Sequence, residues 1–296
     1  MSRGERMVEA SVRQLFMRLQ GRRPLGFGVS GPLATHLFAP HETDRLIGTA
    51  RDQGITIFDT APSYGAGLGE RRLGRAIGND PSVFVMTKAG LTAKGCLQRV
   101  SNFSPQSIIA SVEASLRRLK RDRIDLLWLH GPGRHQIDQP LKHALSGLIR
   151  AGKVAAVGIA SRNQAASAMA ETAPFSAIMA PVYEAASALS PFPSNVAFFG
   201  IEGFRHVPTS DGIPRNRSQL WRATRAIVRG RQLVPESISA DAALDYAFVS
   251  AQCDVLVTTT TKSARIEQNR EICDGVMDRL RVSETYGQGQ MNAGSE

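Results

Sequence analysis

Strand-like and helix-like segments alternate along most of this 296-residue chain. Short apolar runs recur from residue 25 onward, and most are followed by a longer segment with apolar residues every three or four positions. Parallel strands joined by helical crossovers are typical of this pattern, either as a closed (β/α)₈ barrel or as an open doubly wound sheet. The expected strands are Leu25–Val29, Ile55–Asp59, Val83–Lys88, Ile124–His130, Val154–Ile159, Ala177–Val182, Val196–Phe199 and Val255–Val257.

One expected helix has a well-defined start, because Ser104 is a good N-cap and Pro105 suits the first helical position. After Val182 the pattern loosens. Only Glu184–Leu189 is helix-like before the next strand, which predicts a degenerate sixth helix, and a long basic loop, Gly200–Ser237, follows strand seven. The expected helices are Glu42–Gln53, Glu70–Ile77, Pro105–Leu119, Leu141–Arg150, Gln164–Glu171, one near Leu220–Arg229, Ala240–Ala251 and Ser263–Cys273.

Glycines near the first strand bear on the choice between the two architectures. A doubly wound sheet should carry a phosphate-binding turn directly after that strand, but the glycines of Gly26–Gly31 lie inside or just after it, about ten residues before the next helix. We therefore predict a single-domain (β/α)₈ TIM barrel over residues 25–282. Residues 1–24 are an expected N-terminal extension, and the Gly-, Ser- and Asn-rich residues 283–296 are an expected disordered tail.

Charge and composition limit the function classes. The net charge is +10, but the basic runs lack a helix-turn-helix, zinc-ligand or aromatic RNA-binding pattern, so nucleic-acid binding through residues 205–231 would depend on charge alone. No apolar run is long enough to span a bilayer, and no secretory signal is apparent. Three widely spaced cysteines without a CxxC pair favour a reducing compartment without disulfides or a metal site. We expect a cytoplasmic monomer or small homo-oligomer without nucleic-acid or membrane partners.

Four ionisable residues lie at or near the ends of three consecutive expected strands. Asp59 ends the second strand and Tyr64 follows it in a turn, Lys88 ends the third, and His130 ends the fourth. In parallel β/α folds these ends converge on the face where chemistry is done. Taken singly, each has an ordinary structural explanation: a turn carboxylate, a loop aromatic, an edge charge and a structural histidine. Together they predict a catalytic group.

The segments around these residues resemble those of the aldo-keto reductases. The resemblance extends from about Leu25 to Asn269, and its motifs occur in order at compatible spacing. It implies a (β/α)₈ barrel that reduces carbonyls with a nicotinamide cofactor, normally NADPH, and without a metal; the family's catalytic tetrad falls on Asp59, Tyr64, Lys88 and His130. The motifs are Phe58–Gly65, Glu70–Gly74, Thr87–Lys88, Ser115–Leu119, Asp125–His130 and Ala151–Val154.

The chemistry of carbonyl reduction suits this tetrad. Hydride transfer to a carbonyl leaves an alkoxide that needs a proton, so a general acid must contact the oxygen. A phenol such as Tyr64 holds its proton at pH 7, and a nearby Lys88 ammonium would favour the phenolate. Asp59 would pair with Lys88 and keep it charged, while His130 would donate a hydrogen bond that positions the substrate.

The resemblance also implies cofactor contacts near the last strand. Thr258–Asn269 is similar to the segment that wraps the adenosine phosphate in the family. Cations there and the helix N-terminus would suit the 2′-phosphate of NADP(H). An ordinary serine-capped basic helix remains the alternative explanation. The expected contacts in this segment are Thr260, Lys262, Ser263, Arg265, Gln268 and Asn269.

Further cofactor contacts are expected at Gly28, Val29 and Ser161. The nicotinamide pocket departs from the family pattern, because Met179 stands where a Gln commonly holds the carboxamide, and Phe198 or Phe199 replaces the usual stacking Tyr; of these two we expect Phe199. A Phe keeps the stacking face. The loss of the amide predicts weaker or altered cofactor binding and leaves a second hypothesis, a non-catalytic protein that keeps cofactor binding for a regulatory or interaction role.

Overall fold

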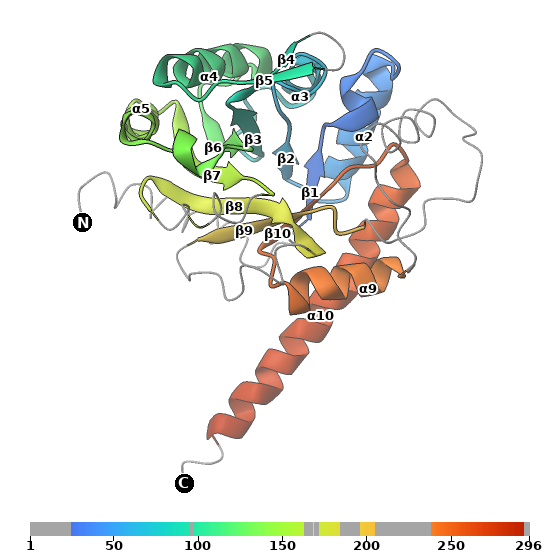
Figure 1. Ribbon diagram of the computed structural model, residues 1–296. Coiled ribbons are helices and arrows are strands. Elements are labelled where there is room, and N and C mark those ends of the chain that lie inside the picture. The colour runs from blue at the N-terminus through green and yellow to red at the C-terminus, as the bar shows by residue number, and fades with distance from the viewer. Residues whose placement is uncertain are drawn as a thin grey trace.

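Eight parallel strands close into a barrel in the order β1-β10-β9-β8-β7-β6-β3-β2 (Figure 1). The computed structural model describes residues 25–94, 98–162, 168, 172–183, 196–204 and 238–292. β1 pairs with both β2 and β10, so this sheet has no free edge; the expected (β/α)₈ barrel is confirmed and the open sheet is excluded. The barrel strands are β1 (Leu25–Gly28), β2 (Ile57–Asp59), β3 (Phe84–Ala89), β6 (Ile124–His130), β7 (Val154–Ala160), β8 (Phe175–Pro181), β9 (Ala197–Ile201) and β10 (Val255–Thr258).

Helices surround the barrel, and a small antiparallel hairpin follows β3. The expected start of α4 is confirmed, because Ser104 Oγ accepts a hydrogen bond from the Ser107 N–H and Pro105 is the first helical residue. The helices and turns are α2 (Pro40–Asp52), α3 (Leu68–Ile77), α4 (Pro105–Leu119), α5 (Gln139–Arg150), α9 (Ala240–Asp245), α10 (Ser263–Asn292), η1 (Gly31–Ala34), η2 (Arg134–Gln136) and the π-helical η4 (Tyr246–Ser250). The hairpin strands are β4 (Leu91–Lys94) and β5 (Gln98–Ser101).

The C-terminal helix differs from the expectation. It was predicted to end at Cys273, with a disordered tail from residue 283, but α10 continues to Asn292 and extends away from the barrel (Figure 1). Val276 is fully buried, and Met277 and Leu280 pack against the outer core, so the apolar spacing that sustains the helix does not stop at Cys273.

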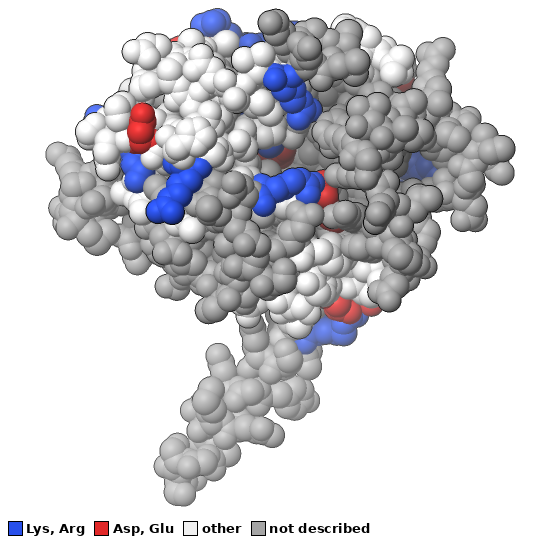
Figure 2. Space-filling model, viewed as in Figure 1, with Lys and Arg blue, Asp and Glu red and all other residues white. Residues whose placement is uncertain are grey.

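Several other expectations lie outside the described residues: the N-terminal extension 1–24, most of the helix expected at 164–171, the degenerate helix at 184–189, and residues 205–237 of the long loop. No helix in the described part of the chain is long and apolar enough to cross a membrane. On the face shown in Figure 2, the Lys and Arg side chains of the described residues lie in several separate groups and not in one continuous patch.

Apolar side chains form two layers, one between the barrel and its helices and one inside the barrel. Inside, the rings of Trp128 and Phe199 meet edge to face with centroids 5.2 Å apart. Gly158 makes room for this contact, since a Cβ there would lie 2.4 Å from Trp128 Cζ3. His130 follows Trp128 by two residues and lies on the same face of β6. The rings of Trp128 and Phe199 therefore lie inside the barrel directly below the strand ends, and they form the floor of the region that contains His130.

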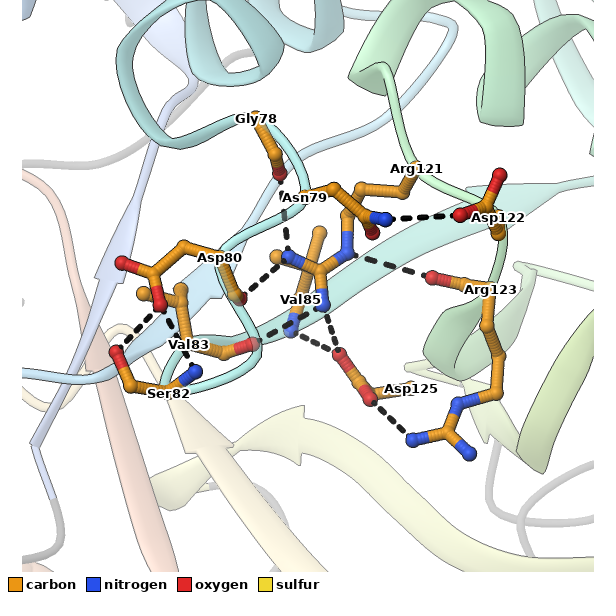
Figure 3. A network of polar contacts seen from close by, with 10 residues as sticks. All are labelled: Gly78, Asn79, Asp80, Ser82, Val83, Val85, Arg121, Asp122, Arg123 and Asp125. Carbon is orange, nitrogen blue, oxygen red and sulfur yellow. Dashed lines mark hydrogen bonds and ion pairs between the residues drawn. The ribbon is translucent and has the colours of Figure 1, made fainter.

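At the opposite end of the barrel, one arginine ties together the turns that lead into β3 and β6 (Figure 3). The Arg121 guanidinium donates to the carbonyls of Gly78, Asp80, Val83 and Arg123 at 3.1–3.3 Å and pairs with Asp125 at 3.3 Å. The Asp125 carboxylate is 4% exposed and also accepts the Val85 N–H at 2.9 Å. This end of a barrel serves stability rather than chemistry.

Replacing Arg121 by Met should therefore destabilise the protein without changing its chemistry. Removing one partner of a buried ion pair costs about 3 kcal/mol or more, because Asp125 would lose its best-buried cation. Chemical denaturation followed by circular dichroism measures this loss. Arg123→Gln is the matched control, since the Arg123 side chain is 53% exposed and its contact with Asp125 spans 3.5 Å, so its loss should cost less than about 1 kcal/mol. Equal losses of stability in both variants would contradict this structural role of Arg121.

Candidate active site

Asp59 and Lys88 form a buried ion pair where β2 and β3 end. Lys88 Nζ lies 2.5 Å from each carboxylate oxygen of Asp59 and donates to the Thr60 carbonyl at 3.0 Å. The two side chains are only 3% and 7% exposed. Burial raises the pKa of Asp59, with Lys88 acting in the opposite direction. Burial would lower the pKa of Lys88, but Asp59 and Tyr64 outweigh it and the net shift is upward, so the lysine stays charged at neutral pH.

Tyr64 lies beside this pair in the turn between β2 and α3. Its ring centroid is 5.2 Å from Lys88 Nζ and 6.0 Å from the His130 ring, which it meets edge to face. The Tyr64 N–H donates to the Ala61 carbonyl at 3.0 Å, so the turn itself fixes the tyrosine backbone. The side chain is half-buried.

His130 ends β6 and is neutral over the physiological range. Burial, helped by the positive charges of Lys88 and Arg99, lowers the pKa of its imidazole to about 3. Ser63 Oγ lies 3.4 Å from Nδ1 of the ring. A neutral imidazole has one N–H donor and one acceptor nitrogen, so His130 can donate a single hydrogen bond.

A second buried ion pair supports the turn that carries Tyr64. The Glu70 side chain on α3 is fully buried and accepts hydrogen bonds from Thr87 Oγ1 at 2.7 Å and from Arg118 Nε at 2.5 Å. Thr87 directly precedes Lys88, so this contact ties α3 to the strand that supplies the lysine. The structure thus brings together all four residues that the sequence placed at separate strand ends.

A sequence model of the aldo/keto reductase family matches residues 24–183, which contain all four of these residues. The chain belongs to the aldo/keto reductase family.

Several curated relatives are named as dehydrogenases or reductases of sugars or sugar derivatives. The D-threo-aldose 1-dehydrogenase of a Pseudomonas species is 37% identical over 164 residues, which cover 46% of this chain and 49% of that protein. The L-galactose dehydrogenase of Arabidopsis thaliana is 33% identical over 145 residues, covering 46% and 43%. The alignments thus span about half or less of these relatives.

Solved aldo-keto reductase structures share the fold. The holo form of an enzyme from Bacillus halodurans has a TM-score of 0.65 at 20% identity, with 84% of this chain and 86% of that one covered. The glycerol dehydrogenase of Gluconobacter oxydans has a TM-score of 0.62 at 20% identity, with 86% and 91% covered. At this identity the likeness establishes the barrel architecture.

The expected phosphate contacts of this aldo/keto reductase lie at the start of α10. Lys262 is exposed, Arg265 is partly exposed, and the Lys262 N–H donates to Thr260 Oγ1 at 3.2 Å. Arg45 of α2 donates to Ser263 Oγ and adds a third cation that the sequence gave no reason to expect. Three cations around a helix N-terminus suit a phosphate group, so the residues present fit the expected cofactor.

Two other expected contacts lie further along α10. Gln268 is exposed, whereas Asn269 is 6% exposed. Both residues follow the expected phosphate contacts along α10, and the exposed Gln268 side chain is accessible to a cofactor. The Asn269 side chain has little accessible surface.

The expected nicotinamide contacts are placed on neighbouring strands. The Ser161 N–H donates to the Met179 carbonyl at 3.0 Å, so these two residues lie side by side. Met179 pairs with Phe199 in the β8–β9 register, and both point into the barrel. The Phe199 ring is fully buried against Trp128 and forms part of the floor. Phe198 packs on the outer side of the barrel.

Gly28 and Val29 lie at the end of β1. The carbonyl of Gly28 accepts a hydrogen bond from Thr259 Oγ1 at 3.0 Å, and a Cβ at Gly28 would lie 2.5 Å from that hydroxyl oxygen, so a side chain there would require Thr259 to move. The Val29 side chain is fully buried in the outer core, and its N–H donates to the Asp59 carbonyl at 2.7 Å. This backbone bond ties the first strand to the backbone of Asp59.

Sequence reasoning missed two polar residues near the tetrad. Ser63 lies within the quoted Phe58–Gly65 motif, and its position next to Tyr64 is a usable signal. Arg99 lies on the hairpin that follows β3, and its effect on His130 depends on tertiary structure that the sequence does not reveal. The described residues contain no group of three or more His, Cys, Asp or Glu side chains that could hold a metal ion.

Proposed function

We propose that this aldo/keto reductase is an NADP(H)-dependent oxidoreductase that reduces an aldehyde or ketone to an alcohol, or catalyses the reverse reaction. The observation that carries the proposal is the buried Lys88–Asp59 pair beside Tyr64 and the neutral His130. The bound cofactor supplies or accepts the hydride. We further propose that the protein acts in the cytoplasm on a small-molecule carbonyl or alcohol, as a monomer or small homo-oligomer.

In the direction of reduction, Tyr64 is the general acid and His130 orients the substrate. The single N–H of His130 donates to the carbonyl oxygen and stabilises the negative charge that grows there. The Tyr64 phenol gives its proton to that oxygen as the alkoxide forms, and Lys88 stabilises the resulting phenolate. Asp59 holds Lys88 in place and keeps it charged. In oxidation the same phenolate accepts the proton from the alcohol.

The proposed substrates are hydroxylated aldehydes such as open-chain sugars in the direction of reduction, and sugar lactols in the direction of oxidation. Support comes from the names of relatives that act on such compounds: a D-threo-aldose 1-dehydrogenase, an L-galactose dehydrogenase and a 6-dehydroglucose reductase. The test follows NADPH consumption at 340 nm against aldoses, glyceraldehyde and simple aldehydes, and NADP⁺ reduction with the matching sugars. NADPH binding is titrated separately by fluorescence. No binding and no turnover would reject the proposal.

Met179 favours the alternative of a non-catalytic, cofactor-binding protein, because a thioether replaces the amide expected for the nicotinamide. The two proposals differ in one measurement. NADPH binding without turnover of any carbonyl in the panel, in the wild type and in Met179→Gln alike, would favour the alternative. Turnover that improves in Met179→Gln would show a working enzyme with a weakened cofactor pocket.

The cations at α10 give a prediction for cofactor preference. Lys262→Ala should raise the Kd for NADPH about tenfold and leave the Kd for NADH unchanged, because only NADPH carries the 2′-phosphate. Arg45→Ala should act in the same direction through its contact with Ser263. Lys262→Arg is the matched control and should keep the preference for NADPH. Equal losses for both cofactors in Lys262→Ala would count against a phosphate contact.

A further inference from the structure

Ser63 is placed to control the proton distribution on the His130 ring. It lies in the turn between Asp59 and Tyr64, its side chain is 5% exposed, and its Oγ is 3.4 Å from Nδ1 of His130. Within the part of the chain that the structure describes, this is the one hydrogen bond made by the imidazole. Among the described residues, it is also the one hydrogen bond that the Ser63 hydroxyl makes.

The direction of this bond decides which ring nitrogen carries the proton. If Ser63 donates, Nδ1 is the acceptor and the proton of the neutral ring is on Nε2. If Nδ1 donates, the hydroxyl hydrogen of Ser63 is left without an acceptor in a buried place. Buried donors are almost always satisfied, so the first arrangement costs less free energy.

Burial is the main reason that the His130 ring stays neutral, and its charged neighbours act in the same direction. Lys88 of β3 and Arg99 of β5 both act on His130 as positive charges, and the Tyr64 ring covers one side edge to face. The Asp59 carboxylate is held by Lys88, so it does not provide the ring with a free counter-ion. A neutral imidazole can adopt two tautomers, and even a weak hydrogen bond at one ring nitrogen can favour one of them.

We propose that Ser63 is a positioning residue that donates its hydroxyl proton to His130 Nδ1 and thereby holds the ring in the Nε2–H tautomer. The Nε2–H group is then the donor for the carbonyl oxygen. This inference depends on the proposed function for its catalytic meaning but concerns a tautomer that can be measured without turnover. The competing explanation is that Ser63 only stabilises the turn before Tyr64.

The first experiment measures the tautomer directly. Protein labelled with ¹⁵N-histidine is examined at pH 7 by long-range ¹H–¹⁵N correlation spectra. The chain has six histidines, so His130→Asn identifies the relevant signal. In the wild type we expect an unprotonated Nδ1 and a protonated Nε2. In Ser63→Ala the two ¹⁵N shifts should move toward each other, as in a tautomer mixture, and Ser63→Thr should restore the wild-type pattern.

Ser176→Ala is the matched control for the spectra. Ser176 is also 5% exposed, but its hydroxyl donates to the Val157 carbonyl at 3.4 Å instead of contacting His130. Its loss should leave the His130 signals unchanged. A wild-type ring with its proton on Nδ1, or a Ser63→Ala spectrum identical to the wild type, overturns the proposal.

Kinetics provide the second readout. Ser63→Ala should lower kcat/KM for carbonyl reduction about tenfold, comparable to the loss of other hydrogen bonds that orient a functional histidine, with NADPH affinity unchanged. The same substitution in a His130→Asn background should have no further effect, because Ser63 acts through the ring. A tenfold loss that persists in that background would show that Ser63 acts on the turn, and would reject the proposal.

The two experiments separate this inference from the proposed function. If no carbonyl is reduced but Ser63→Ala alters the tautomer, the proposed oxidoreductase fails and the positioning contact stands. If NADPH-dependent turnover is present and the tautomer does not respond to Ser63, the enzyme stands and the inference fails.

Discussion

Replacing Tyr64 by Phe is expected to lower kcat/KM for carbonyl reduction by about a thousandfold or more, while the fold and the Kd for NADPH stay unchanged. The substitution removes only the hydroxyl that delivers the proton, and general acid catalysis contributes about 10²–10⁴ to such rates. The Phe ring keeps the edge-to-face contact with His130, whose centroid lies 6.0 Å away. Steady-state kinetics with the best substrate of the panel, together with NADPH titration, measure the effect.

Tyr183→Phe is the control for Tyr64→Phe. The Tyr183 hydroxyl donates to the Gly203 carbonyl at 3.0 Å, and its ring stacks on Tyr246. Its activity should be within about twofold of the wild type, since no proton of the reaction passes through it. If Tyr64→Phe keeps the wild-type rate, another residue must act as the acid.

Asp59→Asn should destabilise the protein by about 3–5 kcal/mol, because it leaves the Lys88 ammonium buried without a counter-ion. Lys88 is 3% exposed, so water cannot replace the carboxylate without opening the site. Activity should fall as well, since the lysine would no longer be held charged beside Tyr64. Denaturant unfolding and steady-state kinetics give the two numbers.

The wild type and Asp59→Asn should also differ in how their stability changes with pH. In the wild type the pKa of Lys88 is raised, so its stabilising contribution is present below the unfolded pKa of 10.5 and is lost only as the pH rises through the folded value. In Asp59→Asn burial should lower the pKa of Lys88. The unfolded state then binds more protons, and the variant should gain stability as the pH rises toward 10.5.

The double variant Asp59→Asn with Lys88→Met tests whether the loss comes from the unpaired charge. It should recover most of the lost stability and remain inactive, because the buried charge is gone and so is the ammonium beside Tyr64. An exposed pair is the reference: Arg75 and Asp44 are 46% and 38% exposed, and Arg75→Gln should cost less than about 1 kcal/mol. A double variant as unstable as Asp59→Asn would contradict this explanation.

The barrel and its tetrad could be predicted because both follow from short-range patterns. Buried strands have apolar runs of characteristic length. When parallel strands close into a barrel, their C-terminal ends lie on one face, so Asp59, Lys88 and His130 come together whatever the details of helix packing. The boundaries of β6 coincide with the expected Ile124–His130, and α4 begins at Pro105 with Ser104 as its N-cap, as expected. These features need no knowledge of distant neighbours.

Other features depend on contacts between residues far apart in the chain. Arg45 reaches Ser263 across 218 positions, and nothing in the sequence near either residue signals that contact. In the sequence Arg121 cannot be distinguished from an exposed arginine, because its partners Gly78 and Asp80 lie about forty residues earlier in the chain. The length of α10 was underestimated because its apolar contacts at Val276 and Leu280 are tertiary, whereas the glycines and polar residues that follow favour disorder on composition alone.

The packed indole and phenyl rings inside the barrel also supply an optical probe. Trp128 is one of two tryptophans in the chain, and its ring lies fully buried inside the barrel, on the strand that ends in His130. Its indole N–H is enclosed without a hydrogen-bond partner in the described structure, so its emission should be shifted to the blue. With Trp221 replaced by Phe, all tryptophan fluorescence of the protein would arise from Trp128, two residues before His130. Quenching by a reduced nicotinamide could then be followed without any attached dye.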